Sequence, residues 1–125
     1  MTGELILIVE DNEKNMKLFR DILGATGYRT LEAVSGERAV ELARSHGPDL
    51  VLMDIQLPGI DGVEALARLR ADGRTARVPV LALTAQAMEG DHERFLAAGF
   101  DAYVSKPVDI AELVATVRRH CDARP

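Results

Sequence analysis

The 125-residue chain contains one cysteine, no tryptophan and few other aromatic residues. A single cysteine cannot form an internal disulfide, which favours a reducing, cytoplasmic setting. The longest apolar run, LILIV at 5–9, is far shorter than the roughly 20 residues that span a bilayer. Basic residues are outnumbered, and the net charge of -5 argues against a nucleic-acid-binding surface. We therefore expect neither membrane nor nucleic acid as a partner.

What the chain does contain is typical of one compact domain with an aliphatic core. Apolar residues make up 47% of it, whereas aromatic residues make up only 4%. Its length is that of a single domain, and neither a linker nor an internal repeat interrupts it. We expect one domain over residues 1–125. Met1 and the short tail 122–125 favour a free-standing protein over a fragment of a longer kinase.

Short apolar runs alternate along the chain with stretches in which apolar residues recur at helical spacing. This alternation predicts strands at 5–10, 28–33, 49–54, 78–84 and 101–105, and helices at 14–23, 35–46, 63–72, 88–97 and 108–121. Strict alternation of strand and helix indicates right-handed crossovers and a parallel sheet. The predicted fold class is therefore α/β, a doubly wound (βα)5 domain with a five-stranded parallel sheet.

Polar residues suited to ion binding or chemistry follow four of the predicted strands. Glu10 ends the first strand and Asp11 follows it, Asp54 ends the third, Thr84 ends the fourth, and Lys106 follows the fifth. In an open parallel sheet, the ligand crevice lies outside the carboxyl ends of the strands. Clustered acids destabilise a protein unless a cation or a reaction requires them. Their convergence therefore predicts a functional site.

The three carboxylates of this set are hard oxygen ligands, which suit a small divalent cation such as Mg²⁺ or Mn²⁺. The backbone carbonyl of Gln56 is a further candidate ligand. Such an ion would make the Asp54 carboxylate approachable by an anionic phosphoryl group, and aspartate is a known nucleophile in phosphoryl transfer. Lys106 and the Thr84 hydroxyl would then contact the phosphoryl oxygens.

Four motifs together resemble the receiver domain of two-component response regulators. They are VEDN at 9–12, LMDIQLPGIDG at 52–62, LALTA at 81–85 and YVSKP at 103–107, in the expected order and spacing. The resemblance implies a flavodoxin-like sheet with strand order 2-1-3-4-5. The stretch VEDNEKNMKLFRDIL at 9–23 is most similar to stand-alone receivers of the DivK type, and receivers of hybrid histidine kinases share it.

The resemblance also implies roles for the residues of the crevice. Asp54 would be the phosphoacceptor, receiving phosphate from a histidine of a sensor kinase or a phosphotransfer protein. Asp11 would bind Mg²⁺ directly, Glu10 would bind it through water, and Gln56 would contribute its backbone carbonyl. Tyr103 would turn inward as a switch residue when Thr84 moves. The small side chain of Ala85 would leave the site open, and the Lys106-Pro107 peptide would be cis.

The first functional hypothesis is thus a single-domain response regulator. Phosphorylation would reshape the face made by the fourth helix, the fifth strand and the fifth helix, and so control the binding of partner signalling proteins, with cell-cycle or developmental control as the expected setting. We expect a monomer or a weak dimer. The chain would not be an enzyme beyond assisting its own phosphorylation and dephosphorylation.

Other hypotheses remain open at this stage. The chain could be the receiver of a hybrid kinase, a phosphorelay intermediate, or a binding module that does not use phosphate. An enzyme on the same fold is disfavoured by two features. Residue 56 is glutamine, where an aspartate-nucleophile phosphatase needs a second acid, and no GxxxxGK[ST] loop for nucleotide binding exists.

Overall fold

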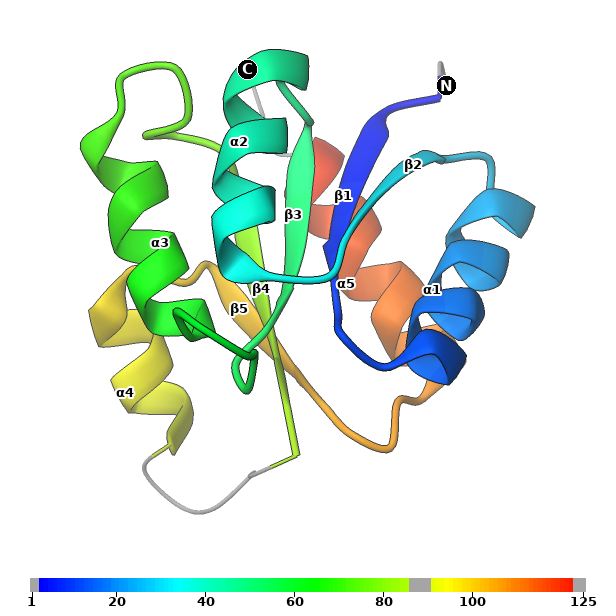
Figure 1. Cartoon of the computed structure of the whole chain (residues 1–125). Coiled ribbons are helices and arrows are strands. Elements are labelled where there is room, and N and C mark those ends of the chain that lie inside the picture. Colours follow the sequence, from blue (N-terminus) through cyan, green and yellow to red (C-terminus); the bar gives the residue numbers. More distant parts are fainter. Residues whose placement is uncertain (1–2, 86–90, 123–125) are drawn as a thin grey trace.

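The computed structural model describes residues 3–85 and 91–122. Five strands alternate with five helices over these residues, in the order β1 (Leu5–Val9), α1 (Glu13–Ala25), β2 (Arg29–Ala33), α2 (Gly36–His46), β3 (Leu50–Asp54), α3 (Gly62–Ala71), β4 (Val80–Thr84), α4 (Asp91–Ala98), β5 (Ala102–Ser105) and α5 (Ile110–Asp122). All strand pairs are parallel, and the strand order is β2-β1-β3-β4-β5 (Figure 1). The predicted fold class and strand order are confirmed.

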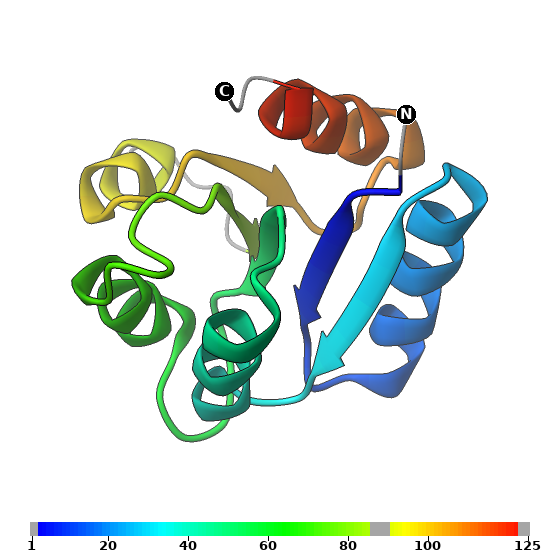
Figure 2. The same ribbon diagram turned by 90° about the horizontal axis from the view of Figure 1, so that it is seen from above.

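The sheet lies between two layers of helices (Figure 2). Alternate residues of the inner strands face opposite sides, so β1 sends Leu7 and Val9 into one apolar cluster and Ile6 and Ile8 into the other. The first cluster is completed by α2, α3 and α4, and the second by α1 and α5. Because both faces of β1, β3 and β4 are covered, these strands are apolar almost throughout, as the sequence indicated.

Helix boundaries follow local capping chemistry. The side chains of Asn12, Ser35 and Asp61 each accept a hydrogen bond from a backbone N–H in the first turn of α1, α2 and α3. Gly47 ends α2 in the left-handed conformation, at φ 57°. These features explain why three helices begin within two residues of their predicted starts. The predicted beginning of the fourth helix at Met88 lies outside the described residues.

β2, β3 and β5 begin one residue later than predicted and β4 begins two later, and before β3 and β5 the aspartate predicted to start the strand bonds the neighbouring strand instead. Asp49 accepts a hydrogen bond from the backbone N–H of Leu5 at 2.8 Å, and Asp101 accepts one from that of Val80, also at 2.8 Å. Each side chain takes the place of a backbone acceptor at the edge of the ladder. Both lie at the amino ends of the strands, away from the predicted site. None of the described helices is long and apolar enough to cross a membrane.

Candidate functional site

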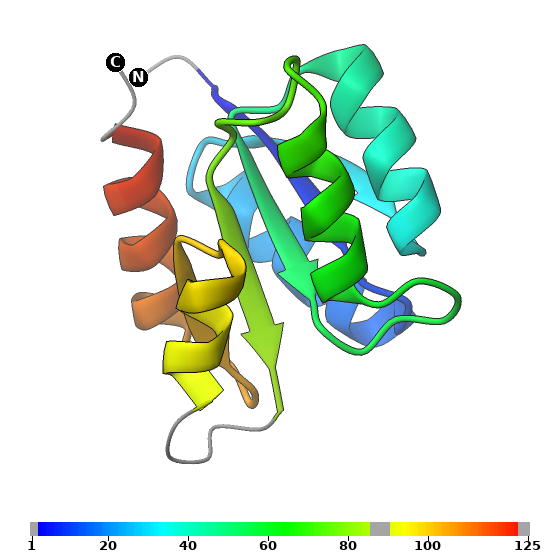
Figure 3. The ribbon, with the colours of Figure 1, turned by 90° about the vertical axis from the view of Figure 1, so that its left-hand side faces the viewer.

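The parallel register places the carboxyl ends of the strands at one edge of the sheet. Val9 pairs with Met53, Asp54 with Leu83, and Thr84 with Ser105. Figure 3 shows β3 and β4 pointing the same way. The strand ends at Val9, Asp54, Thr84 and Ser105 therefore lie along one edge of the sheet, as predicted from strand order.

Three acids gather at this edge. Glu10, Asp11 and Asp54 each offer a carboxylate oxygen, and these oxygens all lie within 4.8 Å of one another. Glu10 is 1% exposed and Asp54 is 5% exposed, whereas Asp11 is exposed. The cluster thus combines two buried carboxylates with one that faces solvent. This difference suits a site that an ion or a phosphate donor enters from the Asp11 side.

Lys106 lies between the two buried acids. Its Nζ is 3.0 Å from Glu10 Oε1 and 3.1 Å from Asp54 Oδ2, and both contacts have hydrogen-bond geometry. The backbone N–H of Lys106 donates to the carbonyl of Thr84 at 2.8 Å, which ties the loop after β5 to the end of β4. The peptide bond between Lys106 and Pro107 is cis. The ammonium therefore offsets the repulsion between two carboxylates drawn from different strands.

Backbone groups fix the remaining oxygens of the same two acids. Asp54 Oδ1 accepts a hydrogen bond from the N–H of Gln56 at 3.0 Å, and Glu10 Oε2 accepts one from the N–H of Asn12 at 3.2 Å. Each buried carboxylate is thus held at one oxygen by its own loop and at the other by Lys106. The Asp54 side chain therefore has a defined orientation in the crevice.

The electrostatics of the crevice follow from this packing. Burial raises the pKa of Glu10 above its ordinary value, and the charge of Asp54 adds to the rise while the hydrogen bond from Lys106 opposes it. Burial by itself would lower the pKa of Lys106, but its hydrogen bonds to Glu10 and Asp54 hold that pKa above the ordinary value. Lys106 therefore stays charged at neutral pH, and Glu10 takes up a proton at a higher pH than an ordinary glutamate would.

The donor set fits a hard divalent cation. Carboxylate oxygens from two loops lie close together, and one of them is exposed. Mg²⁺ favours oxygen ligands and keeps several water molecules, so one open side of the cluster is what such a site requires. The backbone of Gln56 adjoins Asp54 in the same loop. A second positive charge beside Lys106 would further offset the repulsion among the acids.

The other predicted residues lie at the end of β4 and on β5. Thr84 is 3% exposed at the end of β4, and Ala85, the residue after it, is exposed. Tyr103 is half-buried on β5 and lines a cavity of about 370 Å³ together with side chains of α4 and α5. Tyr103 therefore lies on the face that phosphorylation was expected to reshape, outside the acid cluster itself.

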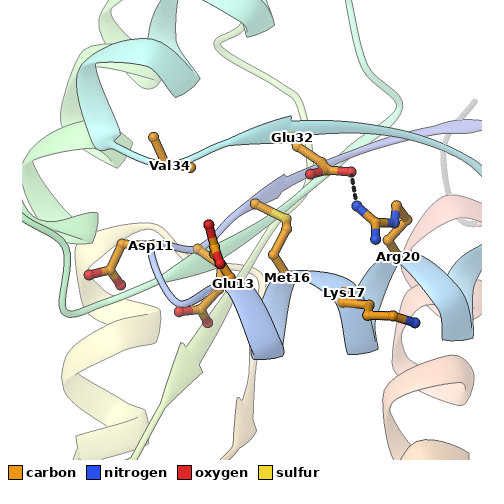
Figure 4. Close-up of a pocket in the computed structure, with 8 residues that line it drawn as sticks. Asp11, Glu13, Met16, Lys17, Arg20, Glu32 and Val34 are labelled. Carbon is orange, nitrogen blue, oxygen red and sulfur yellow. Dashed lines mark hydrogen bonds and ion pairs between the residues drawn. The ribbon is translucent and has the colours of Figure 1, made fainter.

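A second cavity, of about 380 Å³, opens beside the acids (Figure 4). It continues from Glu10 and Asp11 along α1 to β2 and the residue that follows it, with Met16 and Val34 as its apolar lining. Arg20 Nη1 pairs with Glu32 Oε2 at 2.8 Å across this cavity. The cavity therefore borders Glu10 and Asp11, two of the three clustered acids.

Sequence reasoning missed the residues that shape the loop between Asp54 and α3. A Cβ at Gly62 would lie 2.5 Å from the carbonyl oxygen of Asp54, so only glycine lets α3 begin this close to β3. Gly62, directly after the helix-capping Asp61, is the available signal in the sequence. Glu37 of α2 accepts a hydrogen bond from the N–H of Ile60 in the same loop, a contact that no local sequence pattern signals.

Comparisons with known proteins agree with this geometry. The model of the response regulator receiver domain family matches residues 6–118. The chain belongs to this family. Among curated receivers, the chain is 49% identical to the polar-differentiation response regulator DivK of Brucella ovis over 115 residues, which are 92% of this chain and 94% of that protein. The predicted resemblance to DivK-type receivers is thereby confirmed.

Solved structures include the receiver domain of a sensor histidine kinase from Pseudomonas aeruginosa, which has a magnesium ion coordinated in its active-site cleft. It is 39% identical to this chain with a TM-score of 0.90, covering 98% of this chain and 100% of that one. The receiver domain of a Francisella response regulator is 26% identical to this chain with a TM-score of 0.90, and the match covers 96% of this chain and 98% of that one. The receiver fold is thus shared at full length with structures from both kinases and response regulators.

Proposed function

We propose that Asp54 is the phosphoacceptor of a two-component signalling switch. Its phosphate would come from a phosphohistidine on a sensor kinase or a histidine phosphotransfer protein. One observation carries the proposal: a nearly buried carboxylate is held between the Lys106 ammonium and the Gln56 N–H, beside two further acids at the carboxyl edge of the sheet. A merely structural aspartate would not need two more acids within 4.8 Å.

The transfer follows from the position of this carboxylate. An Asp54 oxygen attacks the phosphorus, a P–O bond forms, the P–N bond to the donor imidazole breaks, and its electron pair returns to the imidazole nitrogen. The bonds from Gln56 and Lys106 hold both Asp54 oxygens before the donor arrives, so little orientational freedom remains to be lost. Lys106 then exchanges its carboxylate partner for a phosphoryl oxygen.

Glu10, Asp11, Asp54 and the Gln56 backbone carbonyl would hold Mg²⁺ in this proposal. The ion supplies positive charge that lets an anionic phosphoryl group approach an anionic carboxylate. The oxygen cluster supports this assignment, as does the Pseudomonas receiver with its coordinated magnesium. The exposed side of Asp11 leaves room for the waters that Mg²⁺ retains.

The output would pass through the α4-β5-α5 face. Phosphorylation adds about -1.5 to -2 charge and three acceptor oxygens, which attract Lys106 and the Thr84 hydroxyl. Thr84 would move toward the phosphoryl group and Tyr103 would turn inward, while Ala85 leaves the approach open. Shifting an equilibrium from 1:99 to 99:1 takes about 5.5 kcal/mol. A single charge-assisted hydrogen bond contributes about 1.5 to 3 kcal/mol, so several contacts must act together.

Partner binding on this face is the output that we propose. The cavity beside Tyr103 is bordered by Leu96, which is 47% exposed, and by charged groups that include Asp101 and Arg119. By similarity to DivK, the partners would be signalling proteins of cell-cycle or polar-differentiation control. Relay of the phosphate to another protein is the second candidate, favoured by the 39% identity to a receiver that belongs to a sensor kinase.

Intact mass spectrometry tests the proposal. The protein is incubated with acetyl phosphate and Mg²⁺, beside an Asp54→Asn variant and a sample containing a chelator. We expect a phosphoryl adduct that requires Mg²⁺ and is absent from the variant. If neither acetyl phosphate nor a panel of phosphorylated histidine kinases produces an adduct, the phosphoacceptor role is wrong. A binding module that does not use phosphate would then take its place.

A further inference from the structure

The amino-terminal end of α2 touches the loop that follows Asp54. Glu37, in the first turn of α2, accepts a hydrogen bond at Oε2 from the backbone N–H of Ile60, at 3.4 Å. The neighbouring Gly59 has φ +73°, and a Cβ there would lie 2.7 Å and 3.0 Å from the two Glu37 carboxylate oxygens. The carboxylate therefore occupies the space that any other side chain at position 59 would fill.

On the helix side, Gly36 allows α2 to approach the same loop closely. A Cβ on Gly36 would lie 2.7 Å from Ile60 Cγ1 and 3.0 Å from the Ile60 carbonyl oxygen. Ile60 itself packs against the apolar cluster under α2 and α3. Helix and loop thus meet through positions without side chains on both partners, and Glu37 adds the polar contact between them.

The loop is also held at its base, beside the site. The N–H of Gly62 donates to the carbonyl of Ile55 at 3.0 Å, and the N–H of Gln56 donates to Asp54 Oδ1 at 3.0 Å. The segment between Ile55 and Gly62 is therefore a closed loop with one anchor next to Asp54 and another at Ile60. If Ile60 moves, the few residues between it and Gln56 must change their conformation to accommodate the shift.

A simpler interpretation is that Glu37 only complements the helix dipole, as acids in a first turn often do. That role would place no demand on where the carboxylate points. Here both carboxylate oxygens lie over Gly59 and one accepts from Ile60, 23 residues away in the chain. The contact with the loop therefore goes beyond the dipole.

We propose that Glu37 is a positioning residue for the phosphorylation site. Its carboxylate holds the loop after Asp54 at Ile60, and so fixes the segment that presents Gln56 and Asp54. The consequence for Mg²⁺ and phosphate rests on the function proposed above, whereas the effect on the loop does not. Residues that support metal ligands from outside typically change metal affinity about 10- to 100-fold when replaced. Glu37 is exposed and its bond is long, so we expect about threefold to tenfold weaker Mg²⁺ binding in Glu37→Ala.

The test compares three variants of the full chain. Glu37→Ala removes the acceptor, and Glu37→Gln keeps an acceptor of the same shape without the charge. Glu41→Ala is the matched control, since Glu41 is an exposed acid of α2 that pairs with Arg38 at 3.2 Å. Amide hydrogen exchange is measured by NMR at Gln56 and Ile60 in chelator, and Mg²⁺ dissociation constants are measured by titration of the same amides.

We expect faster exchange at both amides in Glu37→Ala, weaker Mg²⁺ binding in that variant, substantial recovery in Glu37→Gln, and wild-type behaviour in Glu41→Ala. Unchanged exchange in Glu37→Ala would overturn the proposal. If Glu37→Ala shows faster exchange but binds Mg²⁺ with wild-type affinity, Glu37 holds the loop without positioning the site, and the proposed positioning role is wrong. If the wild-type protein binds no Mg²⁺ and takes no phosphate, the proposed function fails, and the exchange measurement still decides whether Glu37 holds the loop.

Discussion

Replacing Lys106 by methionine should lower stability by an amount that depends on divalent cations. In the metal-free crevice, Lys106 is the cation that bridges Glu10 and Asp54, at 3.0 Å and 3.1 Å. Without it, two buried carboxylates face each other with Asp11 close by. A bound Mg²⁺ would supply positive charge in the same place. The loss should therefore be large in chelator and small in Mg²⁺.

The magnitude can be worked from the distances. At an effective dielectric constant of about 20, two unit charges 4.8 Å apart repel by about 3.5 kcal/mol. Each charge-assisted hydrogen bond of Lys106 contributes about 1.5 to 3 kcal/mol. The Lys106 side chain is 20% exposed, and proton uptake by one carboxyl limits the cost. We expect Lys106→Met to lose about 2 to 4 kcal/mol of unfolding free energy at neutral pH in chelator, and less than about 1 kcal/mol in saturating Mg²⁺.

Acidification gives an independent check on the same reasoning. The pKa of Glu10 in the folded protein is raised above 4.5, so ionised Glu10 opposes folding increasingly as the pH rises from 4.5 through the folded pKa. Removal of Lys106 takes away a contact that lowers that pKa and so raises it further. The deficit of the variant in chelator should therefore shrink as the pH falls toward 4.5, because proton uptake by Glu10 removes part of the repulsion that Lys106 offsets in the wild type.

Urea unfolding followed by far-ultraviolet circular dichroism measures these differences in chelator and in Mg²⁺. Lys17→Met is the control, since Lys17 pairs with Asp21 at 2.6 Å on the exposed side of α1. Its loss should stay within about 0.5 kcal/mol in both buffers. An equal loss for Lys106→Met with and without Mg²⁺ would refute the claim that the ion and the ammonium offset the same repulsion.

Two further predictions concern the loops around the sheet. Gly62→Ala should lose about 1 to 3 kcal/mol and weaken Mg²⁺ binding, because its Cβ would lie 2.5 Å from the carbonyl oxygen of Asp54. Gly24 lies in α1 with nothing within 4 Å of the new Cβ, so Gly24→Ala should instead raise the unfolding free energy by up to about 1 kcal/mol. Similar urea midpoints for the two variants would contradict this account. Asp72→Asn tests pH dependence: hydrogen bonds from Arg74 lower the pKa of Asp72 to about 2. A lowered pKa contributes stability above pH 3.8 that is lost as the pH falls toward 2. The difference in unfolding free energy between wild type and Asp72→Asn should therefore vanish over that interval. A constant difference would show that Asp72 acts through packing alone.

Much of the fold was predictable because it depends on local patterns. Apolar runs of strand length, helical spacing and capping residues such as Asn12 and Ser35 act over a few neighbouring residues, and all five strands and five helices were identified from them. Boundaries were less certain where a side chain replaced a backbone partner. Asp49 and Asp101 were predicted to begin strands, but their carboxylates instead bond the first N–H of the neighbouring strand.

The sequence by itself determined the order of elements and the chemistry at the end of each strand, since both depend on residue type and covalent order. Tertiary structure decided which of these groups meet. Lys106 contacts Glu10 across 96 residues, and Glu37 contacts Ile60 across 23. Such pairings depend on strand order, on register and on close approaches that glycine permits at positions 36, 59 and 62. No local preference encodes these distances, because they exist only once the sheet and its helices have packed.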